Sequence, residues 1–106
     1  MTDRFADTFA RLSQERNGAF VPFVNLCDPD EATSLRILKT LVAAGADALE
    51  LGIPFSDPSA DGPVIVASAD RAIRNGATTE KCLKVIEAFR AENKTTPVSV
   101  MLYANL

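Results

Sequence analysis

Residues 44–63 read AGADALELGIPFSDPSADGP, and this stretch decides the fold. Its first half contains a short apolar run, Asp47 to Leu51, which is typical of a strand buried on both faces. One carboxylate, Glu50, interrupts that run. The second half, residues 52–63, is rich in Pro, Gly, Ser and Asp and is longer than most connections from a strand to a helix. We therefore expect a buried strand followed by a long loop, and long loops of this kind commonly carry function.

The flanking sequence predicts further helices and strands. Helices are expected where apolar residues recur three and four positions apart, and strands where short apolar runs lie between turn residues. The expected helices cover residues 3–14, 28–45 and 64–75, with another that begins at Thr78 or Thr79 and continues through Phe89. The other expected strands cover residues 20–24 and 97–103. Pro22 weakens the first of these because it cannot donate a ladder hydrogen bond.

The second of these helices has a clear start signal in the sequence. Asp28 can cap the helix, Pro29 suits the first helical position, and Glu31 follows three residues after the cap, where it can reach back. We therefore expect this helix to begin immediately after Asp28.

The order of elements predicts an α/β fold. Helices separate the strands and no hairpin turn joins them, so the sheet should be parallel. A (β/α)₈ barrel needs roughly 200 residues or more, and three strands cannot close one. The chain is therefore either a small open α/β domain or a fragment of a barrel, and it contains no sign of a second domain.

The composition excludes several classes of protein. Eleven basic residues are scattered among fourteen acidic ones, with a net charge of −3, which argues against a nucleic-acid partner. The amino-terminal segment carries charges throughout and predicts neither a signal peptide nor a membrane span. Cys27 and Cys82 match no metal or redox spacing and are expected to be packing residues of a cytoplasmic protein with reduced thiols.

The chain contains no histidine, so proton transfer at neutral pH would fall first to a carboxylate. Glu50 is the strongest candidate. Side chains alternate along a strand, so Glu50 shares a face with Ala48 and Gly52, opposite Leu49 and Leu51. In a barrel this face points inward, and the carboxyl ends of the strands are where catalysis takes place. The alternative is that Glu50 pairs with a Lys or Arg, or lies in water.

Other candidate residues lie near the same end of the predicted sheet. Asp57 and Asp61 are the carboxylates of the long loop, although either could be a turn residue or a helix cap. Phe23 and Tyr103 have the parity to face the same side as Glu50 and could form an aromatic wall around a flat substrate, or could be core. No glycine-rich phosphate loop is present.

Several segments resemble one known family, the tryptophan synthase α chain. The similarity runs from about Phe20 to Leu106, and its most specific block is residues 44–63. The segments that carry it are FVPFV (20–24), Asp28-Pro29, AGADALELGIPFSDP (44–58), ADGP (60–63) and MLYAN (101–105).

The resemblance implies a (β/α)₈ barrel that cleaves indole-3-glycerol phosphate to indole and glyceraldehyde 3-phosphate, a retro-aldol lyase reaction. It implies that Glu50 is the catalytic acid–base and that Asp61 stabilises the indole N–H as positive charge develops. Phe23, Met101 and Tyr103 match positions that line the indole pocket. Residues 1–106 would then be the amino-terminal fragment of a single barrel domain.

The resemblance also implies a partner protein. Asp57 and Pro58 match a loop that contacts the β chain in the family, and the usual assembly is an α₂β₂ tetramer. The α chain uses no cofactor of its own, because the PLP belongs to the β chain.

Two departures from the family pattern matter. The family commonly has Gly before the Asp-Pro of the first loop, where this chain has Cys27, and Gly permits backbone angles that Cys adopts only at a cost. The later strands and the phosphate-binding loops are absent, so we expect residues 1–106 alone to be inactive. A second hypothesis is a non-catalytic folding unit or β-chain-binding module. A third is another barrel that acts on a different indole or sugar phosphate.

Overall fold

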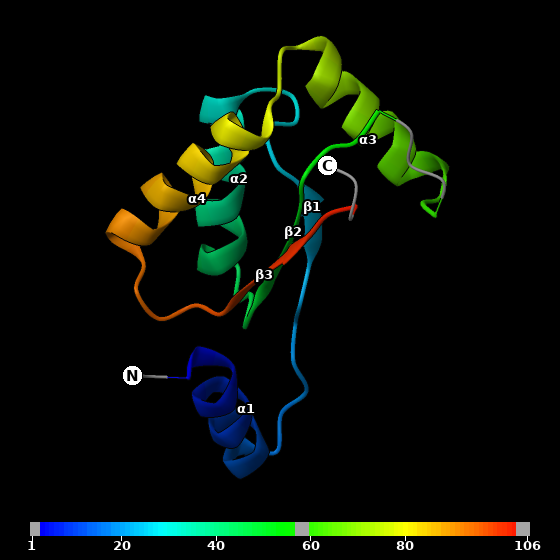
Figure 1. Cartoon of the computed structure of the whole chain (residues 1–106). Coiled ribbons are helices and arrows are strands. Elements are labelled where there is room, and N and C mark those ends of the chain that lie inside the picture. Colours follow the sequence, from blue (N-terminus) through cyan, green and yellow to red (C-terminus); the bar gives the residue numbers. More distant parts are fainter. Residues whose placement is uncertain (1–2, 57–59, 104–106) are drawn as a thin grey trace.

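The computed structural model describes residues 3–56 and 60–103. A first helix is followed by a βαβ unit and then by two helices that lead to a last strand (Figure 1). In chain order the elements are α1 (Arg4–Glu15), β1 (Phe23–Asn25), α2 (Glu31–Ala43), β2 (Leu49–Gly52), α3 (Pro63–Arg74), α4 (Thr79–Glu92) and β3 (Val98–Met101).

The strands form one parallel sheet in the order β1-β2-β3, as the sequence predicts. β2 lies in the centre and pairs with both neighbours. Glu50 is the partner of Phe23 on one side and of Ser99 on the other. The row two residues further along joins Asn25, Gly52 and Met101. Because residues two apart share a face, these two rows present their side chains on the same side of the sheet.

The opposite face of the sheet packs against α2 and α4, which lie side by side (Figure 1). Leu49 and Leu51 on this face are fully buried, so the predicted alternation along β2 is confirmed. Phe89 of α4 and Leu38 of α2 are buried in the same core. The core is thus a sandwich of one sheet face and two helices, and it leaves the Glu50 face uncovered by α2 and α4.

α1 lies apart from the other helices, at the end of the sheet where the strands begin (Figure 1). Asp47, just before β2, links α1 and the segment before β1 to this end of the sheet. Its carboxylate accepts a hydrogen bond from the Phe20 backbone N–H at 2.8 Å and pairs with Arg11 of α1 at 3.4 Å. Within the described ranges, no helix combines the length and the apolar character needed to cross a membrane.

The first strand begins later than the sequence pattern predicts. Phe20 and Val21 stay partly exposed and lie outside β1, which runs from Phe23 to Asn25. Pro22 has no N–H to donate, although its carbonyl accepts a hydrogen bond from Glu50 at 3.0 Å. Regular pairing therefore starts only after the proline.

The predicted start of α2 is wrong. The helix begins at Glu31, and its cap is Asp30, whose side chain accepts a hydrogen bond from the Thr33 N–H at 2.8 Å. Asp28 is not a cap, because its carboxylate is bound elsewhere: it accepts hydrogen bonds from Ser68 at 2.5 Å and from Arg71 at 2.6 and 2.7 Å. The Asp28 side chain therefore connects the loop after β1 to α3. By contrast, the expected cap of α4 is confirmed at Thr78.

Cys27, which stands where the family commonly has Gly, adopts the left-handed backbone conformation, with φ 63°, a region that glycine enters at lower cost. Two contacts hold it there. Its N–H donates to Ser34 Oγ at 3.0 Å, and its thiol lies 3.6 Å from that of Cys82. Both cysteines are buried and free, as expected of packing residues. Burial raises the pKa of both thiols, that of Cys82 to about 12, so neither is reactive at neutral pH.

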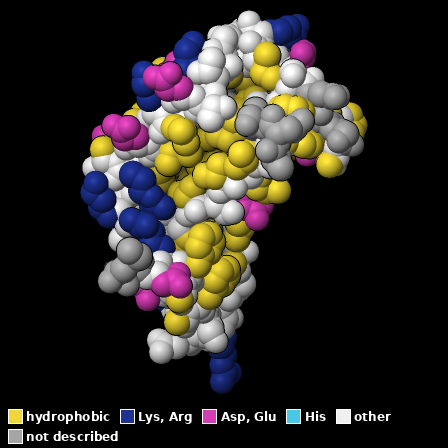
Figure 2. All heavy atoms as spheres, viewed as in Figure 1, with side chains coloured by type: hydrophobic (Ala, Val, Ile, Leu, Met, Phe, Trp, Pro, Cys, Tyr) yellow, Lys and Arg dark blue, Asp and Glu magenta, His cyan; other side chains and the backbone are white. Residues whose placement is uncertain are grey.

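Apolar side chains stay exposed before β1, at Phe20 and Val21, and on and after β3. Figure 2 shows hydrophobic side chains gathered along the middle of the face that it presents. On and after β3, Val100, Met101 and Leu102 are each between 39% and 57% exposed. β1 and β3 are also edges of the sheet in the described part of the chain, and such edges leave backbone groups unpaired.

These edges predict how residues 1–106 behave when expressed alone. We expect self-association and a broad, weakly cooperative thermal transition, because the open sheet edges and the exposed apolar face lack a partner. Circular dichroism melting combined with sedimentation velocity measures this. A sharp transition from a monomer would contradict the expectation.

The Asp28–Arg71 ion pair predicts a pH dependence of stability in the full-length protein. The Arg71 guanidinium holds the pKa of the Asp28 carboxyl below its ordinary value of 3.8. Because the folded-state pKa is lowered, the ion pair stabilises the fold fully at pH values above the ordinary pKa. This stabilisation is lost as the pH falls through the folded-state pKa. Asp28→Asn should therefore be less stable than the parent at pH 7, with the difference shrinking below about pH 4.

Chemical denaturation at a series of pH values tests this. Asp70→Asn is the matched control, since Asp70 pairs with Arg74 of the same helix on an exposed surface. A stability difference for Asp28→Asn that stays constant down to pH 3 would show that the charge of Asp28 is not what stabilises the fold.

Candidate active site

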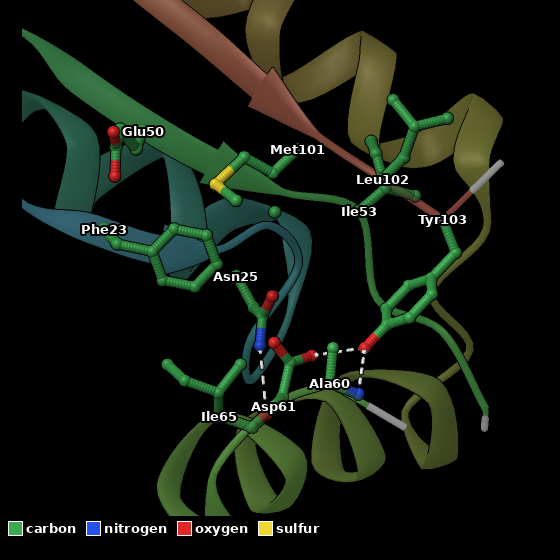
Figure 3. Close-up of a pocket in the computed structure, with 11 residues that line it drawn as sticks. Phe23, Asn25, Glu50, Ile53, Ala60, Asp61, Ile65, Met101, Leu102 and Tyr103 are labelled. Atoms are coloured by element: carbon green, nitrogen blue, oxygen red, sulfur yellow. Dashed lines mark hydrogen bonds between the residues drawn. The ribbon is translucent and has the colours of Figure 1, made fainter. Parts of the chain in front are cut away.

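A cavity of about 580 Å³ opens at the carboxyl end of the sheet, on the face opposite α2 and α4 (Figure 3). Such a volume is typical of sites for small organic ligands. Strands, the long loop after β2, and α3 all contribute to its walls. The lining residues are Phe23, Asn25, Glu50, Gly52, Ile53, Ala60, Asp61, Ile65, Met101, Leu102 and Tyr103.

Glu50 reaches the cavity from β2, the central strand. Its backbone is fixed on both sides by the parallel ladder, with Phe23 and Ser99 as partners. The side chain is partly buried and forms no ion pair with any Lys or Arg among residues 3–56 and 60–103. In the described part of the protein, Glu50 therefore does not pair with a Lys or Arg, which was one of the alternatives that the sequence left open.

Asp61 reaches the same cavity from the loop that precedes α3. The hydroxyl of Tyr103 donates a hydrogen bond to its carboxylate at 3.2 Å and accepts one from the Ala60 N–H at 3.1 Å (Figure 3). The Tyr103 ring stacks on Phe55, with centroids 4.9 Å apart. A residue that follows β3 thus holds the loop that follows β2.

Asp61 does not cap α3. The cap position is Gly62, with Pro63 in the first turn, and this cap makes no side-chain hydrogen bond. The reading of Asp61 as a helix cap is therefore wrong, and its carboxylate is free to face the cavity. Figure 3 shows Glu50 and Asp61 on separate sides of the cavity, with Phe23 and Asn25 between them.

Gly52 is essential to the shape of the cavity floor. A Cβ at this position would lie 2.7 Å from Phe23 Cζ and closer still to Asn25 Oδ1, both well inside ordinary contact distance. The glycine therefore leaves the space that the Phe23 ring and the Asn25 amide occupy. Asn25 is only 8% exposed, and its amide donates to the Ile65 carbonyl at 3.2 Å.

The structure brings together most of the residues that the sequence suggests. Glu50, Asp61, Phe23, Met101 and Tyr103 all line the one cavity. Asp57 and Pro58 lie outside the described residues.

Sequence reasoning missed several lining residues, of which Asn25 and Ile65 are examples. Asn25 carries a signal that could have been read, since it is a polar residue two positions after Phe23 and therefore shares its face. Ile65 carries no such signal, because it belongs to a helix that only the tertiary structure brings to the sheet.

The arrangement suits acid–base chemistry on a flat, largely apolar molecule. Two carboxylates from different elements face this cavity, one on a strand beside an aromatic ring and one hydrogen-bonded to a phenol. Aromatic and aliphatic side chains supply most of the remaining wall. Within residues 3–56 and 60–103, no cluster of three or more His, Cys, Asp or Glu side chains could hold a metal ion.

Comparison with known proteins gives a consistent result. The family model described as the tryptophan synthase alpha chain matches residues 9–106. The tryptophan synthase alpha chain of Vibrio vulnificus strain YJ016 is 54% identical over 104 residues, which is 98% of this chain and 39% of the relative. That of Serratia proteamaculans is 52% identical over the same length. The chain thus spans about two fifths of the length of these relatives.

Solved structures agree. The α subunit from Legionella pneumophila strain Paris has a TM-score of 0.94 at 36% identity, covering 99% of this chain and 40% of that one. A chain in the structure of the tryptophan synthase α₂β₂ complex from Pyrococcus furiosus has a TM-score of 0.77 at 39% identity, covering 82% of this chain and 36% of that one. The expected fold class, part of a (β/α)₈ barrel, is confirmed.

The tight packing at Gly52 predicts the effect of adding one methyl group. In the full-length protein, Gly52→Ala should lower the free energy of unfolding by about 1–3 kcal/mol, because the Phe23 ring and the Asn25 amide must move. Gly18→Ala is the control, since a Cβ there meets nothing within 4 Å. Urea denaturation measures the free energy of unfolding of both variants. Equal losses would show that the close contacts at Gly52 are not the cause of the destabilisation.

Proposed function

The chain belongs to the tryptophan synthase alpha chain family, and we propose that the full-length protein cleaves indole-3-glycerol phosphate to indole and glyceraldehyde 3-phosphate. The reaction is a retro-aldol lyase step. One observation carries the proposal: Glu50 and Asp61, from different elements, face a single apolar cavity large enough for an indole ring.

Cleavage requires two proton transfers. The bond between indole C3 and the glycerol side chain breaks after C3 takes up a proton, which leaves the ring as an indoleninium cation. The side-chain hydroxyl next to that bond loses its proton as the carbonyl of the aldehyde forms. One carboxyl group that gives a proton and then takes one back balances the step. Glu50 would be that group, and its position on the central strand, in the wall of the cavity, supports this role.

Asp61 would act on the charge rather than on the proton at C3. As positive charge develops on the ring, an ionised carboxylate beside the indole N–H stabilises the transition state. The hydrogen bond from Tyr103 supports this role, because it holds the Asp61 carboxylate in position at the wall of the cavity.

The apolar lining would bind the ring. Phe23, beside Glu50 in the sheet, and Met101, on the neighbouring strand, present apolar surface to the cavity. Tyr103 would combine contact with the ring and support of Asp61. Aromatic walls of this kind suit flat, apolar substrates.

We further propose that the chain contributes the amino-terminal part of a single barrel domain in a cytoplasmic protein that pairs with a tryptophan synthase β chain as an α₂β₂ tetramer. The Pyrococcus furiosus complex supports this assembly by similarity. Asp57 and Pro58 would contact the β chain, which would hold the PLP. The α chain would need no cofactor, and the substrate phosphate would bind to residues beyond this sequence.

Glu50→Gln in the full-length protein should lower kcat for indole formation by at least about 100-fold, because an amide cannot give or accept the proton. Glu87→Gln, at an exposed position of α4, is the control and should leave kcat unchanged. Indole release is followed by its colour reaction, and circular dichroism verifies that each variant folds. Normal turnover by the Glu50 variant would remove Glu50 from the mechanism.

Asp61→Asn should lower kcat by about 100- to 1000-fold, as loss of a group that stabilises developing charge does elsewhere, while KM changes little. Steady-state kinetics with indole-3-glycerol phosphate separates the two constants. A rise in KM at unchanged kcat would mean that Asp61 binds the ground state and has no special role in the transition state.

A further inference from the structure

We propose that Asp28 and Arg71 are positioning residues, which hold α3 against the sheet so that Asp61 meets the substrate at the correct place. The inference rests on the proposed function, because it assigns a role to the ion pair in that same reaction. Neither residue lines the cavity. They would act through the helix that follows Asp61.

The ion pair has the geometry of a specific clamp. Arg71 donates through Nε to one oxygen of Asp28 at 2.6 Å and through Nη2 to the other at 2.7 Å. Ser68, one turn earlier on α3, adds a third hydrogen bond at 2.5 Å. The Asp28 side chain is only 14% exposed. A two-pronged Arg–carboxylate pair fixes orientation as well as distance, which a single contact does not.

Two further polar contacts join the same parts of the chain. Asn25, at the end of β1, donates to the Ile65 carbonyl in the first turn of α3 at 3.2 Å. Asn75, at the end of α3, donates to the Pro29 carbonyl at 2.8 Å. With the Asp28 pair between them, the contacts secure α3 to β1 and its loop along the whole helix.

Apolar packing alone holds α3 weakly. Its buried side chains are the small Ala69 and Ala72. The larger Ile65, Val66 and Ile73 are only half-buried, and Val64 in the first turn is 79% exposed. α2 and α4, by contrast, pack against the sheet through buried Leu and Phe side chains. The polar contacts therefore carry a large share of the restraint on α3.

A shift of α3 would reach Asp61 directly. The helix begins at Pro63, only two residues after Asp61, with Gly62 as its cap. Misplacement of a reacting group by about 1 Å can cost about 100-fold in rate. Tyr103 holds Asp61 from the side of β3, and the Asp28 clamp would hold it from the side of β1.

The chain offers a matched control on the same helix. Arg74 pairs with Asp70 at 3.0 Å, but both side chains are more than 60% exposed and both belong to α3. That pair cannot connect the helix to the sheet. Arg71→Met and Arg74→Met therefore remove the same charge from the same helix, and only the first removes the clamp.

Kinetics of the full-length protein with indole-3-glycerol phosphate provide the first test. Arg71→Met should lower kcat by about 10- to 100-fold, with KM close to that of the parent. Arg71→Lys should recover only part of the loss, because an ammonium cannot make the two-pronged contact. Arg74→Met should match the parent.

A double-mutant cycle with Asp61→Asn asks whether the clamp acts through Asp61. If it does, Arg71→Met should lower kcat far less in the Asp61→Asn background than in the parent. If kcat of the double variant falls by the full product of the two single losses, the proposal is overturned. A rise in KM at unchanged kcat in Arg71→Met would also overturn it. A parent protein that forms no indole would instead refute the proposed function.

Hydrogen exchange gives a readout that does not depend on turnover. The Val66 N–H is bonded to the Gly62 carbonyl at 3.0 Å in the first turn of α3. Its exchange should accelerate in Arg71→Met and stay at the parent rate in Arg74→Met. Unchanged exchange in Arg71→Met would show that the pair does not restrain the start of α3 and would overturn the proposal independently of the kinetics.

Discussion

The parallel pairing of β2 with both neighbours is the constraint on which the site depends. It sets Glu50 level with Phe23 and Gly52 level with Asn25 and Met101. Because side chains alternate along each strand, this register sends Leu49 and Leu51 to the helices and the Glu50 row to the cavity. A slip of one residue would bury the carboxylate among leucines and expose the core, so the hydrophobic packing of α2 and α4 also keeps the register of the site.

The two carboxylates are held by different means, and the difference follows from where each lies. Glu50 belongs to a strand with a neighbour on each side, so the ladder fixes its backbone. Asp61 lies in a loop, where no ladder exists, and depends on Tyr103 and on the placement of α3. Catalytic groups on loops generally need such support from surrounding contacts. The polar contacts from β1 and its loop to α3 meet this need in a region where apolar packing is sparse.

The sequence predicted the strands, the helices and the parallel sheet well, because their signals are local. Apolar spacing gave the helices, and the alternation around Glu50 gave the inward face of β2. The errors lie where a local signal competed with a distant partner. Asp28-Pro29 has the pattern of a helix start, but Arg71, 43 residues away, binds the carboxylate, and Asp30 becomes the cap. The late start of β1 has a local cause instead, because Pro22 has no N–H to donate to the ladder.

By itself, the sequence determined the family, the parity of Glu50, and the identity of five residues that line the cavity. The parity of Glu50, Phe23 and Tyr103 follows from the alternation of side chains along each strand, which depends on neighbours within a few positions. The family, and with it Met101 and the choice of Asp61, came from the resemblance carried by specific blocks such as residues 44–63. Only the tertiary structure decided that Asp61 is not a helix cap, that Tyr103 binds it, and that Asn25 and Ile65 complete the wall. These facts depend on contacts between segments about 40 residues apart, and such contacts are fixed by how the sheet and α3 pack together, which no local pattern records.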